Sequence, residues 1–374
     1  MSPFNKNVQA FLSLVRAGLW EQDIQLESFG QIDFKEVYRL AEEQSVVGLV
    51  AAGIEHVIDV KIPQSEALTF VGSALQLEQR NVAMNVFVAK LIDQLRCQDI
   101  YAILVKGQGI AQCYERPLWR ASGDVDILLS NTNYGKAKEV LVPLALSVEP
   151  EYTAFKHLGM KMKGGFEVEL HGTLHSRLSR RVDGVVDEAQ YDVFYGGNVR
   201  SWRNGDTTVY LPAPDVDVIF VFTHILHHFF FEGIGLRQIC DWCRLLWTYR
   251  DKIYIKLLEK RIRKAGLMTE WKTFAAFAVD WLGMPAEAIP LYSTKPKWKK
   301  KAERICADVL KVGNFGHNRA QTTGESQPYL IRKFISFWSH LIFVLRHFTI
   351  FPKDSVVFFG GVFRTGLHAI LRGE

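Results

Sequence analysis

Cysteine is scarce in this chain, and proline and glycine occur at ordinary levels. These levels exclude several classes of protein. Five cysteines among 374 residues are too few for a disulfide-stabilised scaffold, so we expect a reducing compartment. Twelve prolines and 28 glycines exclude collagen and low-complexity sequence. Hydrophobic residues make up 48% of the chain, which supplies a sizeable core and excludes a mostly disordered protein.

The chain also lacks a long, uncharged apolar run. Residues 1–19 carry scattered Asn, Lys, Gln and Arg, so we expect no signal peptide. The most apolar segment, residues 334–351, contains His340, Arg346 and His347. It falls short of the roughly 20 apolar residues that a membrane span needs. A cytoplasmic protein is therefore expected.

Positive charge is concentrated near the C-terminus. Residues 295–374 hold 14 Lys and Arg against 5 Asp and Glu, whereas the rest of the chain is slightly acidic. A basic segment of this kind predicts an anionic partner. One candidate is the anionic inner face of the membrane, to which the protein would be peripheral. Nucleic acid is less favoured because few aromatic residues accompany the lysines of 295–301. A solvated lysine run beside a buried closing helix is the third interpretation.

Hydrophobic periodicity predicts an α+β fold with a small mixed sheet and flanking helical regions. Short runs rich in β-forming residues predict strands at 100–105, 125–129 and 166–170, and we expect 192–199 and 207–211 to close the sheet. Apolar residues at helical spacing dominate on both sides of these strands. The expected regions are an N-terminal helical region (1–97), an α+β core (98–212), a helical domain (213–290) and a basic C-terminal helical segment (291–374).

The sharpest chemical feature is the acidic pair in Gly123-Asp124-Val-Asp126-Ile-Leu-Leu129. Successive side chains of a strand point to opposite faces, so Asp124 and Asp126 share one face. Two neighbouring carboxylates repel each other, and a divalent cation such as Mg²⁺ or Mn²⁺ removes that penalty. The pair therefore predicts a cation site, although a solvated edge strand would show the same pattern.

A second strand carries polar groups on one face. In Phe166-Glu167-Val-Glu169-Leu-His171, the two glutamates and the histidine alternate with apolar residues. If this strand lies beside the Asp124/Asp126 strand, a third carboxylate joins the pair. Three carboxylates on adjacent strands can hold two cations and assist deprotonation of an attacking hydroxyl. An ordinary exposed face is the alternative.

A possible anion site precedes both strands. Leu104-Val-Lys106-Gly107-Gln108-Gly109 predicts a strand that runs into a glycine turn and then a helix. Such a turn presents backbone N–H groups to phosphate, and Lys106 supplies positive charge. Taken alone the segment is neither a Walker A loop nor a dinucleotide fingerprint, and a plain turn explains it equally well.

The order of these features resembles the nucleotidyltransferase fold shared by DNA polymerase β and kanamycin nucleotidyltransferase. It is more closely similar to an uncharacterised bacterial nucleotidyltransferase family. Members of that family read Leu-Lys-Gly, Tyr-x-x-Pro-x-x-Arg, Asp-Ile-Asp-Leu-Leu and Asp/Glu-Leu-His. The matching segments here are Val105-Lys106-Gly107, Tyr114 to Arg120, Asp124 to Leu129 and Glu169-Leu170-His171. The resemblance covers residues 35–250.

The resemblance implies roles for the acidic residues. Asp124 and Asp126 are the expected metal ligands, and both count among the expected catalytic residues. Glu169 is the expected third carboxylate, as a ligand or a base. Glu167 competes for that role because it shares the strand face, and His171 is expected to orient a carboxylate.

The resemblance also implies a nucleotide site at Lys106, Gly107 and Gln108. Arg120 is expected either to pair with a phosphate or to brace the Asp124 strand. Two departures from the wider superfamily stand out. The usual Gly-Ser is Gly-Gln in this chain, and Asp124 comes 17 positions after Gly107, which is a longer gap than usual.

A separate cluster of histidines and cysteines allows a zinc site. His224, His227, His228, Cys240 and Cys243 fall within 20 residues, and Zn²⁺ readily takes two histidines and two cysteines. The same residues sit in strongly apolar helical segments, where a cysteine behaves as a small hydrophobe. Both interpretations stay open, with buried core residues favoured.

The predicted function is Mg²⁺-dependent (or Mn²⁺-dependent) transfer of a nucleoside monophosphate from an NTP such as ATP to an unidentified acceptor. The chain is thus expected to be an enzyme. The departure at Gln108 leaves an alternative, which is an inactive member of the fold that serves as a binding or scaffold protein. Such a protein would associate with the membrane surface, for example in envelope polysaccharide assembly.

Overall fold

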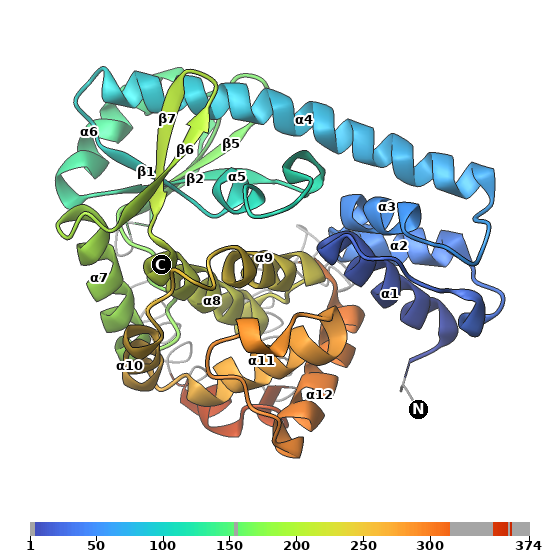
Figure 1. The fold of residues 1–374 in the computed structure, drawn as a ribbon. Coiled ribbons are helices and arrows are strands. Elements are labelled where there is room, and N and C mark those ends of the chain that lie inside the picture. The colour runs from blue at the N-terminus through green and yellow to red at the C-terminus, as the bar shows by residue number, and fades with distance from the viewer. Residues whose placement is uncertain (1–3, 153–155, 315–346, 358–359, 361–374) are drawn as a thin grey trace, which may run out of the picture.

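A five-stranded mixed sheet organises the computed structural model of the chain (Figure 1). The structure describes residues 4–152, 156–314, 347–357 and 360. Most of the apolar segment at 334–351 lies outside the described residues. The strand order is β1-β2-β5-β4-β3, in which β2 and β5 are parallel and the other neighbours are antiparallel. The strands are β1 (Ala102–Val105), β2 (Asp124–Leu129), β3 (Ser147–Val148), β4 (His157–Lys161) and β5 (Glu167–His171).

The predicted α+β class is confirmed, and one predicted strand is wrong. Residues 192–194 end helix α7 (Arg180–Phe194), which Ser179 caps. They are helical because Val193 continues the helical spacing of the buried valines and Ala189. The strand expected at 207–211 is present as β7 (Thr207–Pro212). It pairs with β6 (Val199–Asn204) in a separate two-stranded sheet, which does not extend the main sheet by hydrogen bonding.

The two faces of the main sheet are covered by different helices (Figure 1). Ile127 and Leu129 pack with α4 (Gln64–Arg96) and α6 (Asn131–Leu141). On the other face, Leu128 packs with residues of α7 and with Phe220 of α8 (Pro214–Phe231). Because side chains alternate along β2, Asp124 and Asp126 share this second face and point toward α8.

Helix α8 is buried because it is apolar on nearly all sides. It packs in one core with helices from both ends of the described chain. These helices are α1 (Lys6–Trp20), α2 (Phe34–Glu43), α3 (Val47–Glu55), α9 (Leu236–Thr248), α10 (Ile255–Ala265), α11 (Met268–Leu282) and α12 (Pro296–Val312). No helix in the described part of the chain is both long and apolar enough to cross a bilayer.

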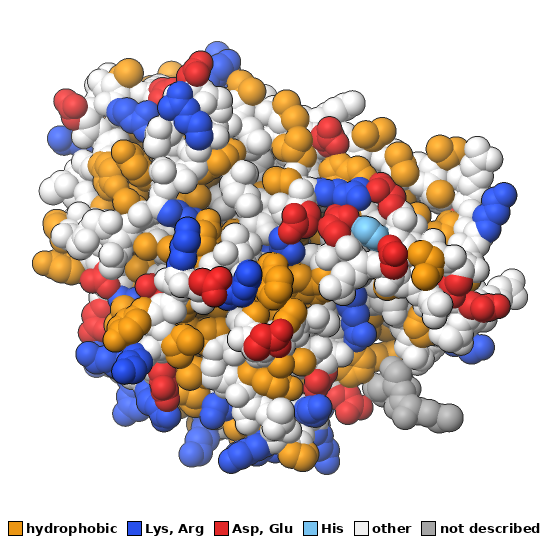
Figure 2. All heavy atoms as spheres, in the orientation of Figure 1, with side chains coloured by type: hydrophobic (Ala, Val, Ile, Leu, Met, Phe, Trp, Pro, Cys, Tyr) orange, Lys and Arg blue, Asp and Glu red, His pale blue; other side chains and the backbone are white. Residues whose placement is uncertain are grey.

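The 33-residue helix α4 connects this core to the sheet and leaves one face in solvent (Figures 1 and 2). At 1.5 Å per residue it is about 50 Å long. Phe70 and Ala74 join the helical core, whereas Val88 and Leu91 pack under the sheet. Apolar side chains lie along its exposed face in Figure 2, and the exposed set includes Leu68, Leu75, Val82 and Val86.

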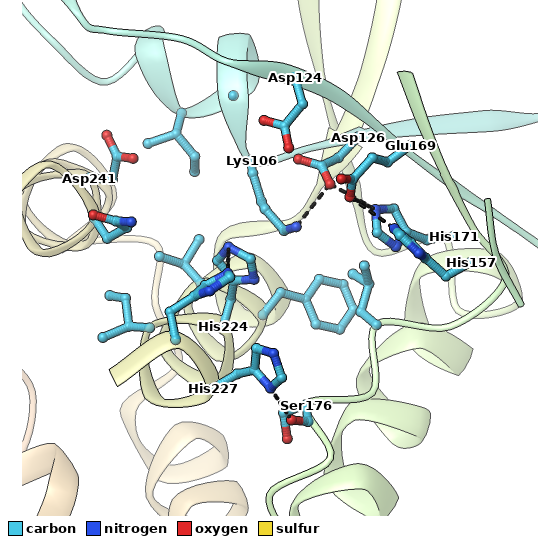
Figure 3. Close-up of a pocket in the computed structure, with 18 of the residues that line it drawn as sticks. Lys106, Asp124, Asp126, His157, Glu169, His171, Ser176, His224, His227 and Asp241 are labelled. Atoms are coloured by element: carbon cyan, nitrogen blue, oxygen red, sulfur yellow. Dashed lines mark hydrogen bonds and ion pairs between the residues drawn. The ribbon is translucent and has the colours of Figure 1, made fainter. Parts of the chain in front are cut away.

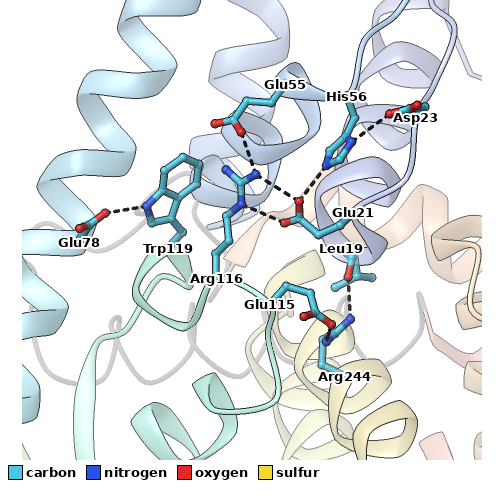
Figure 4. Close-up of polar contacts among 10 residues, drawn as sticks. All are labelled: Leu19, Glu21, Asp23, Glu55, His56, Glu78, Glu115, Arg116, Trp119 and Arg244. Atoms are coloured by element: carbon cyan, nitrogen blue, oxygen red, sulfur yellow. Dashed lines mark hydrogen bonds and ion pairs between the residues drawn. The ribbon is translucent and has the colours of Figure 1, made fainter.

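A loop between α5 (Gly107–Ala111) and β2 joins the N-terminal helices to the core through arginines (Figure 4). Arg116 lies 3.0 Å from Glu21 and 2.8 Å from Glu55. Arg244 of α9 reaches the same loop and pairs with Glu115 at 2.8 Å. These contacts hold the segment that leads directly into the Asp124 strand.

Candidate active site

A cavity of about 480 Å³ lies between the polar face of the sheet and α8 (Figure 3). Lys106, Asp124, Asp126 and Glu169 line its sheet side, and His224 lines its helical side. The volume falls within the range of small-molecule binding sites. The predicted acidic and basic residues therefore meet in one cavity.

The parallel pairing of β2 and β5 brings the third carboxylate to the acidic pair. In the register of the two strands, Asp126 is opposite Glu169 and Asp124 is opposite Glu167. Asp124, Asp126 and Glu169 each offer one oxygen within 4.8 Å of the others. Glu167 is exposed at the start of β5 and does not line the cavity. Of the two glutamates, the geometry thus favours Glu169 as the partner of the aspartates.

The three carboxylates have different electrostatic environments. The charge of Asp126, together with burial, raises the pKa of Asp124. Burial alone would raise the pKa of Asp126, but Lys106 and His171 outweigh it and lower that pKa. Burial also opposes ionisation of Glu169, but hydrogen bonds from His157 and His171 hold its pKa well below the usual value. Repulsion at Asp124 is the penalty that a bound cation would remove.

The lowered pKa of Glu169 predicts a pH-dependent contribution to stability. Ionised Glu169 stabilises the folded protein above the unfolded pKa of about 4.3, and this stabilisation is lost as the pH falls toward the lower folded pKa. The wild type should therefore lose its stability advantage over Glu169→Gln as the pH falls below about 4.3. Urea unfolding of both proteins from pH 7 to pH 3 measures this difference, with Glu167→Gln as the matched control. A constant difference over this range would contradict the assignment.

Lys106 extends from a strained turn toward the carboxylates. Its Nζ donates to Asp126 Oδ1 at 2.9 Å. The Lys106 backbone has a φ of 56° and a ψ of −142°, a sparsely populated conformation that typically costs about 1–3 kcal/mol. Gly107 follows with a φ of 37°, and a Cβ there would lie 3.3 Å from the Asp124 carbonyl oxygen. Strain at this turn is consistent with a functional role for the lysine.

Gln108 makes its polar contacts inside the fold. Its Nε2 donates to Asn85 Oδ1 at 2.7 Å, and its Oε1 accepts from Ser122 at 2.7 Å. The side chain is 2% exposed and does not line the cavity. The predicted contact with phosphate is therefore not carried by the Gln108 side chain, which links the turn to α4 and to the loop before β2.

Arg120 forms a buried ion pair behind the aspartates. Its Nε and Nη2 donate to the two oxygens of Asp241 on α9 at 2.9 and 2.6 Å. The Tyr114 hydroxyl donates to the same carboxylate at 2.7 Å. Of the two roles predicted for Arg120, these contacts favour bracing of the Asp124 strand.

His157 is a site residue that the sequence interpretation missed. Its Nε2 lies 3.1 Å from Glu169 Oε2, and His171 Nε2 lies 2.7 Å from Asp126 Oδ1. His157 begins β4, which pairs antiparallel with β5 across a turn that contains two glycines. Gly164 and Gly165, just before the Glu169 strand, were the signal in the sequence that could have predicted this hairpin and thus the strand of His157.

The histidines and cysteines of the zinc hypothesis separate in the structure. Cys240 and Cys243 are buried in the apolar core of α9, and burial raises the pKa of both thiols. No cluster of metal-ligating side chains among the described residues includes either cysteine. His224 instead faces the cavity, where burial and then Lys106 lower its pKa well below the usual value. The described residues thus favour buried cysteines over a zinc site that uses them.

The donor set of the cavity fits a divalent cation. Asp124, Asp126 and Glu169 supply the oxygen ligands that Mg²⁺ and Mn²⁺ prefer. Lys106 and His171 balance part of their charge within the protein. These three carboxylates are the residues that would hold the ion.

The mixed sheet thus carries an acidic pair on one strand, a third carboxylate on the parallel neighbour and a lysine turn beside them. The chain belongs to the family described as "Uncharacterised nucleotidyltransferase", whose model matches residues 30–283. No curated protein matches the chain. Among solved structures, an antigenic nucleotidyltransferase-like protein from Paracoccidioides brasiliensis is 13% identical. That match covers 54% of this chain and 92% of the other, with a TM-score of 0.32.

Proposed function

We propose that the protein is a nucleotidyltransferase that moves a nucleoside monophosphate from an NTP to an acceptor with the help of Mg²⁺ or Mn²⁺. One observation carries the proposal: Asp124, Asp126 and Glu169 converge beside Lys106 in a cavity large enough for a nucleotide. Membership of the family supports the reaction class.

In the proposed reaction, the acceptor oxygen forms a bond to the α-phosphorus of the NTP. The bond from that phosphorus to the oxygen that bridges it to the β-phosphate breaks, pyrophosphate leaves with that oxygen, and the acceptor proton passes to solvent water. A divalent cation, when bound, supplies charge stabilisation for the phosphates and orients them. Lys106 is placed to bind a phosphate oxygen, since its ammonium reaches the carboxylates from the turn at Gly107. Glu169 remains ionised because of its lowered pKa, which suits a ligand better than a base.

A second candidate function is an inactive binding or scaffold protein. Gln108 occupies the position where the wider superfamily has a serine, and its side chain is bonded within the fold. Association with an anionic membrane surface through the basic segment belongs to this candidate. The described residues of that segment include the lysine run at the start of α12, whose Lys299 and Lys300 are exposed.

Calorimetric titration with ATP, GTP, CTP and UTP tests the proposed function. We expect one nucleotide to bind with a cation and to bind much more weakly without it, because the carboxylates repel a bare triphosphate. The Asp124→Asn variant should lose the cation-dependent part, with circular dichroism to confirm folding. Folded wild-type protein that binds none of the four nucleotides would overturn the enzyme proposal and favour the scaffold candidate.

A further inference from the structure

Two histidines stand beside the carboxylates on adjacent strands. In the antiparallel register of β4 and β5, His157 is directly opposite His171. Their ring centroids are 4.9 Å apart, and both rings point toward the Glu169 side chain (Figure 3). The side chain of His157 is 23% exposed and that of Glu169 is 32% exposed, so an ion in the cavity can reach them.

The donor atoms of this group have the spacing of ligands around one ion. Glu169 Oε2 lies 3.1 Å from His157 Nε2 and 3.3 Å from His171 Nε2. Bonds of about 2.0–2.2 Å to a metal place neighbouring ligand atoms roughly 3.0–3.5 Å apart at octahedral or tetrahedral angles. One atom of each of the three residues lies within 4.8 Å of the others. Without an ion, Glu169 is hydrogen-bonded to the same two rings.

The chemistry of the donors differs from that of the aspartate pair. Two imidazoles and one carboxylate suit divalent transition ions such as Zn²⁺, Co²⁺ and Fe²⁺, whereas Mg²⁺ takes oxygen ligands. Asp124, Asp126 and Glu169 offer only oxygen. The two ligand groups share Glu169 and therefore adjoin.

We propose that His157, Glu169 and His171 form a second cation position that selects a divalent transition ion over Mg²⁺. The role of this position in nucleotidyl transfer rests on the proposed function, but the binding of the ion does not. When an ion is bound there, His171 Nε2 would bind the ion in place of its hydrogen bond to Asp126. The cavity then holds two adjacent cations of different chemical preference.

Titration of the nucleotide-free full-length protein with Co²⁺ tests this position. The intensity and position of the visible absorption bands report the coordination geometry and donor set of Co²⁺, and calorimetry gives the affinity. We expect His157→Gln to weaken Co²⁺ binding at least about 10-fold, in line with the cost of disturbing a metal site. Asp124→Asn should leave Co²⁺ binding in place and weaken Mg²⁺ binding. His157 begins a strand and is partly exposed, so its substitution should leave the fold intact.

His175→Gln is the matched control. His175 also lines the cavity and contacts a carboxylate, Asp187, at 2.6 Å, but it lies outside the proposed position. Unchanged Co²⁺ affinity in folded His157→Gln would overturn the inference and leave the two histidines as hydrogen-bonding partners of Glu169. If Mg²⁺-dependent nucleotide binding persists in that case, the proposed function stands without the second position. If Co²⁺ binds as expected but no nucleotide does, the second position stands and the proposed function fails.

Discussion

Asp126→Asn is expected to weaken cation-dependent nucleotide binding at least about 100-fold, and to lower the rate of transfer by roughly 1,000-fold once an acceptor is known. Loss of a cation ligand removes several kcal/mol of charge stabilisation, and about 1.4 kcal/mol corresponds to each factor of ten. Asp126 is buried at the centre of the site, between Lys106 and His171. Calorimetry with the nucleotide identified for the wild type measures the loss of binding.

Two further variants keep this prediction testable. Asp126→Asn removes the carboxylate that pairs with the Lys106 ammonium, and this loss also lowers the stability of the fold. Asp124→Asn avoids that problem because neutralising Asp124 relieves its repulsion with Asp126. Glu167→Gln is the matched control, since Glu167 lies on the same strand as Glu169 but outside the cavity. Retention of wild-type affinity by both aspartate variants would exclude the acidic pair as the cation site.

Arg120→Met is expected to lower the free energy of unfolding by about 3–5 kcal/mol. Removal of one partner of a buried ion pair leaves an uncompensated charge, and costs of that size are typical. Arg120 is 5% exposed and Asp241 is 6% exposed, so the Asp241 carboxylate would retain only Tyr114 as a described hydrogen-bond partner. Urea denaturation followed by circular dichroism measures the change.

The ion pair between Arg263 and Glu259 supplies the comparison. It joins residues four apart on the solvent-exposed face of α10, where such pairs contribute at most about 0.5 kcal/mol. The double variant Arg120→Met/Asp241→Leu should recover part of the lost stability because it removes both charges. If Arg120→Met loses no more stability than Arg263→Met, the buried pair does not brace the Asp124 strand.

Local sequence patterns predicted the two acidic strands because a strand repeats every two residues. Alternation alone places Asp124 with Asp126, and Glu169 with His171, whatever the rest of the fold does. The helical domain expected at 213–290, which contains α8 and α9, was likewise predicted from apolar spacing. Such short-range signals do not specify which strand lies beside which. The strand expected at 192–199 was wrong because Val193 continues the helical repeat of α7, and β6 begins only at Val199.

Local sequence patterns do not predict contacts between segments that are far apart in the chain. His157 reaches Glu169 through strand pairing, and Arg120 reaches Asp241 across 121 residues of chain. Gln108 stands in a phosphate-binding position by sequence, but partners on α4 and in the loop before β2 hold its amide. Cys240 and Cys243 keep metal-ligand spacing on one helix, yet packing directs them into the core.

The sequence by itself determined the α+β fold class, the order of the motifs and the strand face on which each carboxylate lies. These properties follow from periodicities of two and 3.6 residues, which a strand and a helix carry without a partner. Only the tertiary structure decided that Glu169 rather than Glu167 joins the aspartates, and that histidines from two strands meet beside them. Register and packing make those choices, because they depend on which surfaces are buried together and not on the order of neighbouring residues.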